Sequence, residues 1–194
     1  MLRDFPLPTS VDFAHQLLTD RLQPGDWVVD ATAGNGHDTA FLAQRVSPTG
    51  RVFAFDVQAE AIVSTQARLE TAQMGTLCTL IHAGHQTLAE HLPQESHGKI
   101  AAFVFNLGWL PGHDKTCITR TETTLQAIGL ALEWLCVGGV MTVVAYPGHA
   151  GGDTEASAVG GWMSALPSNA YEVRHLRPAN RQGKSPECWA VRKR

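Results

Sequence analysis

Five short apolar segments alternate with segments of helical character along this 194-residue chain, and this alternation constrains its fold more than any other feature. Within each segment the apolar residues are nearly continuous, which is typical of parallel strands covered by helices on both faces of a sheet. The segments are Trp27–Ala31, Arg51–Asp56, Thr76–Ala83, Lys99–Asn106 and Val140–Tyr146. The sequence therefore predicts an α/β protein with a doubly wound, Rossmann-like sheet.

The remaining segments complete the expected fold. Helices are predicted over Ser10–Leu22, Asp38–Val46, Gln58–Met74, Gln86–Leu92, Cys117–Leu135 and Thr154–Leu166. Ser10 is expected to cap the first helix, and Gly138-Gly139 to end the fifth. Two further strands, Tyr171–Leu176 and Glu187–Val191, are expected to form an antiparallel pair at one edge of a mostly parallel seven-stranded sheet. No repeat or linker interrupts the pattern, so residues 1–194, N-terminal helix included, are expected to form one domain.

The composition excludes several classes of protein. A hydrophobic content of 44% and a formal net charge of -3 fit a globular protein and disfavour one that coats nucleic acid non-specifically, which would be strongly basic. The four cysteines stand far apart without a CxxC pair, as in reduced cytoplasmic proteins. No run approaches about 18 apolar residues and the N-terminus lacks a signal-peptide core, so we expect a cytoplasmic protein with no membrane partner. The nine histidines follow no metal-binding pattern, so no metal is expected.

The turn after the first strand has the composition of a ligand-binding loop. It reads D-A-T-A-G-N-G from Asp30 to Gly36, and glycines in such a turn let backbone N–H groups approach a ligand. Asp56 ends the second strand twenty residues past Gly36 (56 − 36 = 20), where a carboxylate can accept hydrogen bonds from both ribose hydroxyls of an adenosine. A plain β–α turn followed by a surface aspartate is the alternative explanation.

This turn resembles the first motif of the class I S-adenosylmethionine-dependent methyltransferases. The resemblance implies S-adenosylmethionine as cofactor, with its amino-acid end at the motif, its ribose at Asp56 and its adenine edge near the turn after the third strand. The cofactor-binding residues that it implies are Asp30, Ala31, Thr32, Gly34, Asn35, Gly36, Asp38, Thr39, Asp56, Val57, Gln58, Gly84, His85, Asn106 and Leu107.

A second loop, after the fourth strand, carries the expected acceptor site. Asn106-Leu107-Gly108-Trp109 is similar to the N-P-P-Y tetrapeptide of methyltransferases that modify exocyclic amines, with two prolines replaced. An amide oxygen and a backbone carbonyl can accept the hydrogens of an amine, and an adjacent ring can stack on a base. The substrate-binding residues expected are Gly108, Trp109, Leu110, Tyr146 and Asn180. Alternatively, Trp109 and Leu110 are core residues and Asn106 caps a turn.

Longer strings resemble a narrower family. N-L-G-W-L-P-G-H-D-K and Y-P-G-H-A-G-G-D are similar to small bacterial proteins described as ribosomal RNA methylases, some of them assigned to 5-aminomethyl-2-thiouridine of the transfer RNA wobble position. Trp109 occupies the position of a tyrosine in that family, and His113 occupies the position of a glycine. The resemblance implies N-methylation, with transfer RNA as a transient partner. An alkylammonium must lose a proton before it attacks, so the catalytic candidates are Asn106, Asp114, Asp38 and His149.

Several alternatives remain open at this point. The acceptor could be ribosomal RNA or a small-molecule amine, and a homodimer is possible. A non-catalytic cofactor- or RNA-binding module would leave the acceptor loop without a role, and a nicotinamide-dependent dehydrogenase lacks its three-glycine fingerprint here. Basic residues are frequent near the C-terminus, and the chain ends with Arg192-Lys193-Arg194. A solvated face is the usual explanation of such a pattern, and contact with RNA phosphates is the alternative.

Overall fold

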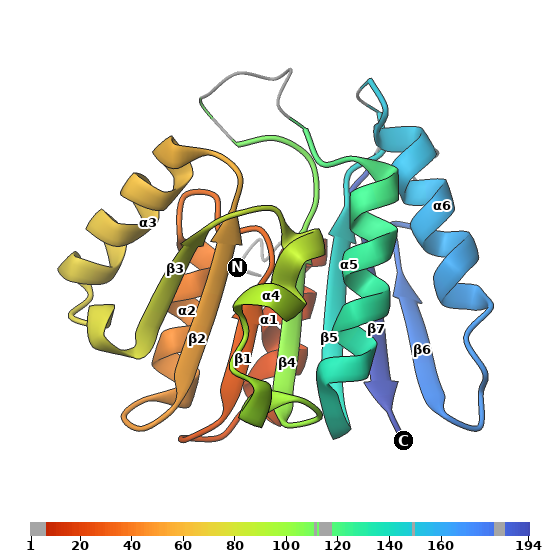
Figure 1. Ribbon diagram of the computed structural model, residues 1–194. Helices are drawn as coiled ribbons and strands as arrows, with labels where there is room; N and C mark the ends of the chain where they lie inside the picture. The colour runs from red at the N-terminus through yellow and green to blue at the C-terminus, as the bar shows by residue number, and fades with distance from the viewer. Residues whose placement is uncertain (1–6, 111, 113–117, 149, 181–184) are drawn as a thin grey trace, which may run out of the picture.

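The computed structural model describes residues 7–110, 112, 118–148, 150–180 and 185–194. Its strands form one sheet in the order β3-β2-β1-β4-β5-β7-β6 (Figure 1). β1 to β5 are parallel, and β7 runs antiparallel to both of its neighbours, β5 and β6. The strands are β1 Trp27–Asp30, β2 Arg51–Asp56, β3 Cys78–His82, β4 Ile100–Asn106, β5 Leu135–Ala145, β6 Tyr171–Leu176 and β7 Glu187–Lys193. The predicted mostly parallel seven-stranded sheet is confirmed.

Helices cover both faces of the sheet, as predicted. On one face lie α1 Ser10–Arg21, α2 His37–Val46 and α3 Ala59–Thr71, and on the other α4 Leu88–His91, α5 Thr121–Trp134 and α6 Gly152–Ser164. In Figure 1, α4, α5 and α6 stand in front of the sheet and α1 and α2 behind it. The described residues also form short 3-10 turns: η1 Gly75–Leu77, η2 His85–Thr87 and η3 Gln94–Ser96.

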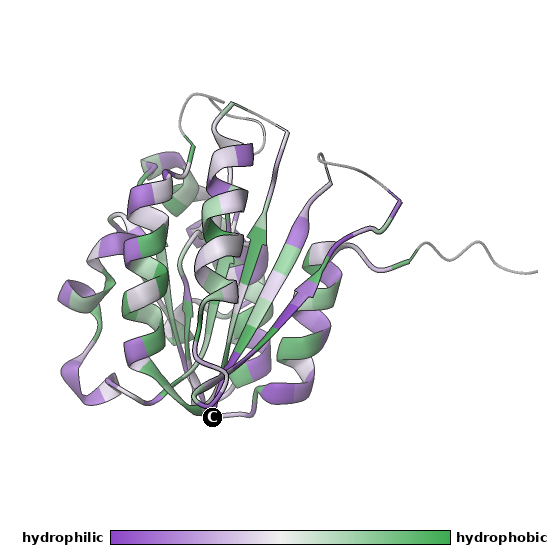
Figure 2. Cartoon of the chain, turned by 90° about the vertical axis from the view of Figure 1, so that its right-hand side faces the viewer, coloured by the Kyte–Doolittle hydropathy of each residue, from purple (hydrophilic) through white to green (hydrophobic). Residues whose placement is uncertain are grey.

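The double coverage explains why the central strands β1, β4 and β5 are largely apolar and buried. Along β4, Phe103 and Phe105 join the core under α5 and α6, whereas Ala102 and Val104 join the core under α1 and α2. Both sets are buried, so both faces of the strand are covered with apolar side chains along this stretch. Figure 2 shows the hydrophobic inner strands between the two helical layers, with more hydrophilic residues on the edge strand β6.

Two local expectations were wrong. Thr9, and not Ser10, is the N-cap of α1: its hydroxyl accepts the Asp12 N–H, while the Ser10 hydroxyl donates to the Pro186 carbonyl. Gly138 and Gly139 do not end a helix but lie inside β5, which begins directly after α5. β5 bulges here, since Ile100 pairs with Leu135 but Ala102 pairs with Val140, and glycine accommodates such a bulge.

Gly36, the N-cap of α2, lies close to the backbone of α3. Its φ is +78°, and a Cβ at this position would lie 2.8 Å from the Thr65 Cα of α3. Gly36→Ala is therefore expected to lower the free energy of unfolding by about 3 kcal/mol, through backbone strain and overpacking together. Gly161→Ala in α6, where an added Cβ meets nothing within 4 Å, should change stability by less than about 1 kcal/mol in either direction. Denaturant titrations check both, and equal effects would contradict the close approach of α2 and α3.

Candidate functional site

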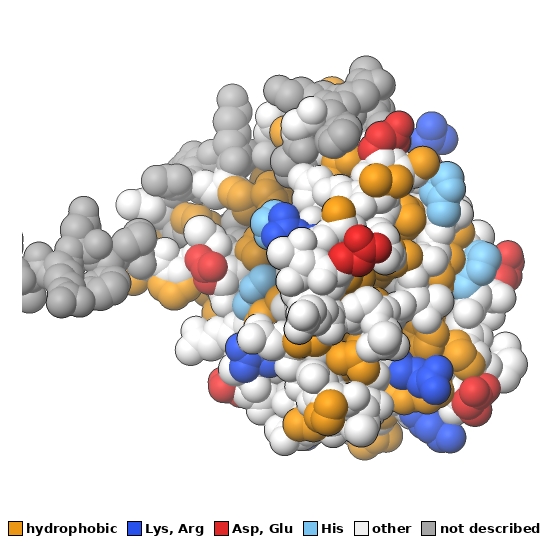
Figure 3. Space-filling view, turned by 90° about the vertical axis from the view of Figure 1, so that its left-hand side faces the viewer, with side chains coloured by type: hydrophobic (Ala, Val, Ile, Leu, Met, Phe, Trp, Pro, Cys, Tyr) orange, Lys and Arg blue, Asp and Glu red, His pale blue; other side chains and the backbone are white. Residues whose placement is uncertain are grey.

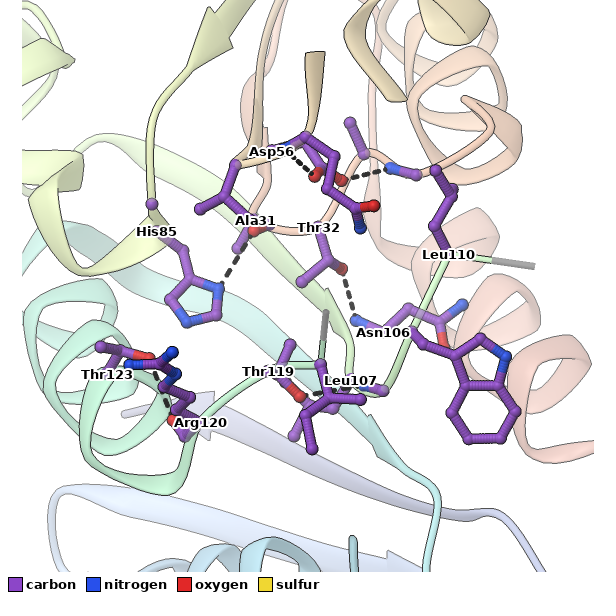
Figure 4. Close-up of a pocket in the computed structure, with 18 of the residues that line it drawn as sticks. Ala31, Thr32, Asp56, His85, Asn106, Leu107, Leu110, Thr119, Arg120 and Thr123 are labelled. Carbon is purple, nitrogen blue, oxygen red and sulfur yellow. Dashed lines mark hydrogen bonds between the residues drawn. The ribbon is translucent and has the colours of Figure 1, made fainter. Parts of the chain in front are cut away.

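A cavity of about 660 Å³ opens at the carboxyl ends of the parallel strands, where doubly wound sheets bind ligands. Figure 4 shows that its lining comes from the loops that follow β1, β2, β3 and β4 and from the start of α5. The predicted site residues among its lining are Ala31, Thr32, Gly34, Asn35, Asp38, Asp56, Val57, Gln58, Gly84, His85, Asn106, Leu107, Gly108, Trp109, Leu110 and Tyr146. The two loops that the sequence singled out thus border one cavity.

Asp30 supports the first loop from below. It is fully buried, accepts the Thr39 hydroxyl at 2.6 Å and the Thr32 N–H at 3.1 Å, and does not line the cavity. Burial, followed by the nearby charge of Asp38, raises the pKa of Asp30 to about 7. Thr39 is buried against it, and Gly36 packs on α3, so three of the predicted cofactor residues lie beneath the loop surface.

Asp56 faces the cavity and joins two backbone turns. Its Oδ2 accepts the Gly34 N–H and its Oδ1 accepts the Gln58 N–H, each at 2.9 Å (Figure 4). Each carboxylate oxygen has two lone pairs, so acceptor capacity remains for a ligand. Val57, next in the chain, is 58% exposed, which leaves an apolar surface beside the carboxylate.

His85 presents a neutral ring to the cavity. Burial lowers its pKa, and its Nδ1 lies 3.3 Å from the Ala31 carbonyl, to which the neutral ring donates. The other ring nitrogen, Nε2, is then an acceptor. A neutral imidazole in this place can accept a hydrogen bond from an amino group of a ligand.

Asn106 ties the second loop to the first and does not merely cap a turn. Its backbone N–H donates to the Thr32 hydroxyl at 2.7 Å, and its Nδ2 donates to Asp38 Oδ2 at 3.2 Å. Its side chain also hydrogen-bonds Tyr146, whose pKa is raised by burial and by the charge of Asp38. The amide oxygen, the Asp38 carboxylate and the Tyr146 phenol therefore come together at one wall of the cavity.

The acceptor loop is held by a buried carboxylate on α6. Glu155 accepts the hydroxyls of Thr119 and Thr124 at 2.6 and 2.7 Å, and Thr119 in turn accepts the Gly108 N–H at 3.0 Å. Trp109 pairs with Ile118 across an isolated β-bridge. Leu110 is buried, as the alternative explanation from the sequence expected, whereas Trp109 is half-buried.

The family model described as "Putative rRNA methylase" matches residues 52–192. The chain belongs to this family. It is 36% identical over 180 residues to the chloroplastic tRNA (mnm(5)s(2)U34)-methyltransferase of Arabidopsis thaliana, covering 89% of this chain and 65% of that protein, so it spans somewhat less than two thirds of that enzyme's length.

Two solved structures agree with the fold. A "putative rRNA-methylase" from Clostridium thermocellum has a TM-score of 0.93 and 36% identity, covering 98% of this chain and all of the other. A "putative methyltransferase" from Streptococcus mutans, in complex with SAH, has a TM-score of 0.86 and 32% identity, covering 97% of this chain and 100% of the other. The class I methyltransferase fold predicted from the sequence is confirmed, and the family agrees with the predicted enzyme class and with S-adenosylmethionine as cofactor.

Other predicted site residues lie elsewhere. Asp114 and His149 fall outside the described residues. Asn180 is exposed in the segment after β6 and does not line the cavity. The described histidines, cysteines and carboxylates form no cluster that could hold a metal ion. Within the described ranges, each helix is too short or too polar to cross a bilayer.

The C-terminal basic residues lie away from the site. β7 runs opposite to β5, so Arg192 to Arg194 end at the sheet edge opposite the cavity (Figure 1). The Lys193 ammonium donates to the carbonyls of Leu132 and Leu135, both at 2.8 Å, and so caps the end of α5. On the side of the molecule that carries β3 and α3, basic and acidic side chains are interspersed among the residues described (Figure 3).

Reasoning from the sequence missed several residues at the site, among them His37, Gln86 and Ile118, which line the cavity. Arg120 and Thr123, at the start of α5, line the cavity. His15 on α1 contacts Asp38 at 2.6 Å. Arg120, Thr123 and His15 stand in no motif that would mark them as part of a site, and only their spatial neighbours identify them.

The wild-type protein is expected to lose stability as pH rises because Asp30 must ionise while buried, and the Asp30→Asn variant is expected not to show this loss. The folded-state pKa of about 7 exceeds the ordinary 3.8, so Asp30 contributes stability that is present below about pH 4 and is lost as pH rises through 7. In denaturant titrations, the stability of the variant relative to wild type should rise by on the order of a few kcal/mol between about pH 4 and pH 8. A stability difference that does not change with pH would contradict the burial argument for Asp30.

Proposed function

We propose that this methyltransferase transfers the methyl group of S-adenosylmethionine to the aminomethyl nitrogen of 5-aminomethyl-2-thiouridine at the wobble position of transfer RNA. The observation that carries the proposal is the Asn106–Asp38 pair, joined at 3.2 Å, on the wall of the cavity. An alkyl amine is mostly protonated at pH 7, so its methylation requires a group that takes a proton, and a carboxylate in this place supplies one. The similarity to the plant enzyme supports the same acceptor.

The residues of the first half of the cavity fit the cofactor. Asp56 retains lone pairs for the two ribose hydroxyls, and the exposed Val57 offers an apolar surface to one side of the adenine. His85 Nε2 accepts a hydrogen from the adenine amino group. Asp30 and Thr39 hold the loop from below, so the loop backbone meets the amino-acid end. When bound, the cofactor supplies a methyl group on a sulfonium, which is an electrophile.

The second half of the cavity fits the acceptor. The Asn106 amide nitrogen is engaged with Asp38, so the amide oxygen is the part of this side chain that accepts a hydrogen from the amine. The half-buried Trp109 ring lines the cavity three residues after Asn106, where an aromatic side chain can contact a base. Arg120, exposed at the rim, offers a cation to an RNA phosphate. Glu155 fixes the loop, and with it the positions of these groups.

The chemistry is a displacement preceded by proton loss. Asp38 takes a proton from the ammonium, the amine lone pair forms the new N–C bond, and the S–C bond breaks with its electron pair going to sulfur. The chain contributes alignment and removal of the proton, and alignment alone can supply a large part of the acceleration. The proposed homodimer and the cytoplasmic location stay predictions, which the described contacts do not test.

Nucleoside analysis tests the acceptor. Purified protein is incubated with methyl-labelled S-adenosylmethionine and total RNA from a strain that lacks the gene, and the digested nucleosides are separated by mass spectrometry. Label in 5-methylaminomethyl-2-thiouridine is the expected result. RNA from a strain that carries the gene is the control and should accept little label, because its sites are already methylated. Label in a different nucleoside would overturn the wobble-base proposal.

Ribosomal RNA is the second candidate acceptor. The family model is named for an rRNA methylase, and the ribosomal RNA small subunit methyltransferase H of Bifidobacterium adolescentis is 32% identical over 87 residues, which is 44% of this chain and 25% of that protein. In the same experiment, size fractionation of the RNA before digestion separates the candidates. Label confined to the ribosomal fraction would favour this second acceptor.

A further inference from the structure

His15 lies behind Asp38, on the side away from the cavity. Its Nε2 is 2.6 Å from Asp38 Oδ1, while Asp38 Oδ2 accepts the Asn106 amide at 3.2 Å. Asp38 lines the cavity and His15 does not. The Asp38 side chain is 9% exposed and the His15 side chain 27%. The carboxylate therefore stands between the cavity and a partly solvated imidazole.

The local structure fixes this imidazole. The His15 ring is stacked on Phe41 with ring centroids 3.9 Å apart and an interplanar angle of 4°. Arg45 lies over the same Phe41 ring, 5.3 Å from its centroid. His15 is in the middle of α1, which packs on β5 and β7, and Asp38 is in the first turn of α2, where the helix N-terminus favours an anion. Two helices thus hold the pair in one orientation.

Titratable or charged groups on β1, after β5, on α1 and on α2 lie near the pair. Asp30 lies beneath it on β1, and Tyr146 follows β5; the Asp38 charge raises the pKa of both. Asp12 faces His15 from one turn earlier on α1, and Arg45 lies beyond Phe41. His15 is the basic side chain that contacts the Asp38 carboxylate among the residues described. An imidazole N–H here both offsets the acidic surroundings and orients the carboxylate.

We propose that His15 is a positioning residue, which donates Nε2–H to Asp38 Oδ1 and so turns Oδ2 toward the acceptor ammonium as proton acceptor. The inference rests on the proposed amine acceptor. The ammonium N–H bond breaks, its electron pair stays on nitrogen, and the proton goes to Oδ2; after transfer, Asp38 returns the proton to water. Nothing in this sequence of steps requires His15 to change its protonation.

Two substitutions, His15→Gln and His15→Leu, separate this role from a purely structural one. The glutamine side chain keeps an N–H at the place of Nε2, whereas the leucine side chain keeps the contact with Phe41 and lacks the donor. At saturating cofactor and RNA, His15→Leu is expected to slow single-turnover methyl transfer about 30-fold at pH 7, a modest share of what acid–base catalysis supplies. The single-turnover rate of His15→Gln should stay within about threefold of the wild-type rate. The dissociation constant for SAH should stay within about twofold of the wild-type value in both variants.

The pH profile is the readout that a structural role would not move. As pH rises toward the ordinary pKa of an alkyl amine, about 10, more of the acceptor is already neutral and the defect of His15→Leu should shrink. Three results would each overturn the proposal. They are a rate defect of His15→Leu that is equal at every pH, an equal rate defect in His15→Gln, and a raised dissociation constant for SAH. The last outcome would instead make the pair part of the cofactor site.

The chain offers a matched control in His175. Its ring is stacked on Trp189 with centroids 3.8 Å apart and an angle of 5°, its Nε2 lies 3.0 Å from Glu187, and its side chain is 26% exposed. His175→Leu removes the same kind of stacked, paired imidazole at the far side of the sheet. It should lower thermal stability about as much as His15→Leu and leave methyl transfer unchanged.

A measurement on the protein without substrate tests the donation from His15 to Asp38 separately from the proposed RNA acceptor. The ¹⁵N chemical shifts of the His15 ring report which nitrogen carries the proton. We expect Nε2 to be protonated at neutral pH and to lose its downfield proton signal in Asp38→Asn. Nε2 without a proton would overturn the donation to Asp38 even if the RNA is methylated. If wild-type protein labels no RNA amine while Nε2 is protonated, the proposed function fails and the donation stands.

Discussion

Asp38→Asn is expected to lower the single-turnover rate of methyl transfer about a thousandfold at pH 7, within the range of a lost general base. The variant keeps the size of the side chain, and its single amide oxygen can still accept the Asn106 N–H, whereas its NH₂ group then faces His15 Nε2. It loses the charge that attracts the acceptor ammonium and the basicity that takes its proton. Measurements at saturating cofactor and RNA report the transfer step alone.

The controls for Asp38→Asn separate chemistry from charge. Glu60→Gln removes an exposed carboxylate from the first turn of the neighbouring helix α3, and should leave the rate within about twofold. The dissociation constant for SAH should change little in either variant. If Asp38→Asn instead weakens SAH binding and leaves transfer intact, Asp38 binds the cofactor and does not act on the amine.

The strands could be predicted because their signals are local. β2 and β6 begin and end where the sequence predicted, since each is a short β-rich run between turn residues. Gly138-Gly139 misled the prediction because a glycine pair after a helical segment has the same local pattern whether it makes a turn or a strand bulge. One contact at this boundary comes from far along the chain: the Lys193 ammonium, 58 residues past Leu135, donates to the Leu135 carbonyl.

The site could be predicted only in so far as its residues stand next to one another in the chain. Asp30 to Gly36 and Asn106 to Leu110 each form a loop, and the sheet order brings the ends of β1 and β4 together. The bond between Asn106 and Asp38 joins positions 68 apart, and that between His15 and Asp38 positions 23 apart. Neither spacing follows a helix or strand period, so the sequence could name Asp38 and Asn106 but not their pairing, and could not name His15.

Asp56→Asn is expected to weaken binding of SAH between about a hundredfold and a thousandfold, because each hydrogen bond to a charged acceptor is worth about 1.5–3 kcal/mol. The wild-type carboxylate accepts two backbone N–H groups and retains lone pairs for two ribose hydroxyls. An amide has a single acceptor oxygen, and its NH₂ group would face either the Gly34 or the Gln58 N–H. The variant therefore loses ribose contacts and also the link between the two turns.

Calorimetric titration with SAH checks this expectation, and a matched aspartate supplies the control. Asp26 also accepts a backbone N–H, that of Gln23 at 2.9 Å, but lies before β1 at the opposite edge of the sheet. Asp26→Asn should leave the dissociation constant for SAH within about twofold, since only the local turn is weakened. Denaturant titrations of both variants show whether each remains folded at the titration temperature. A folded Asp56→Asn protein that binds SAH as tightly as wild type would mean that the ribose lies elsewhere, and that Asp56 serves only to join the two turns.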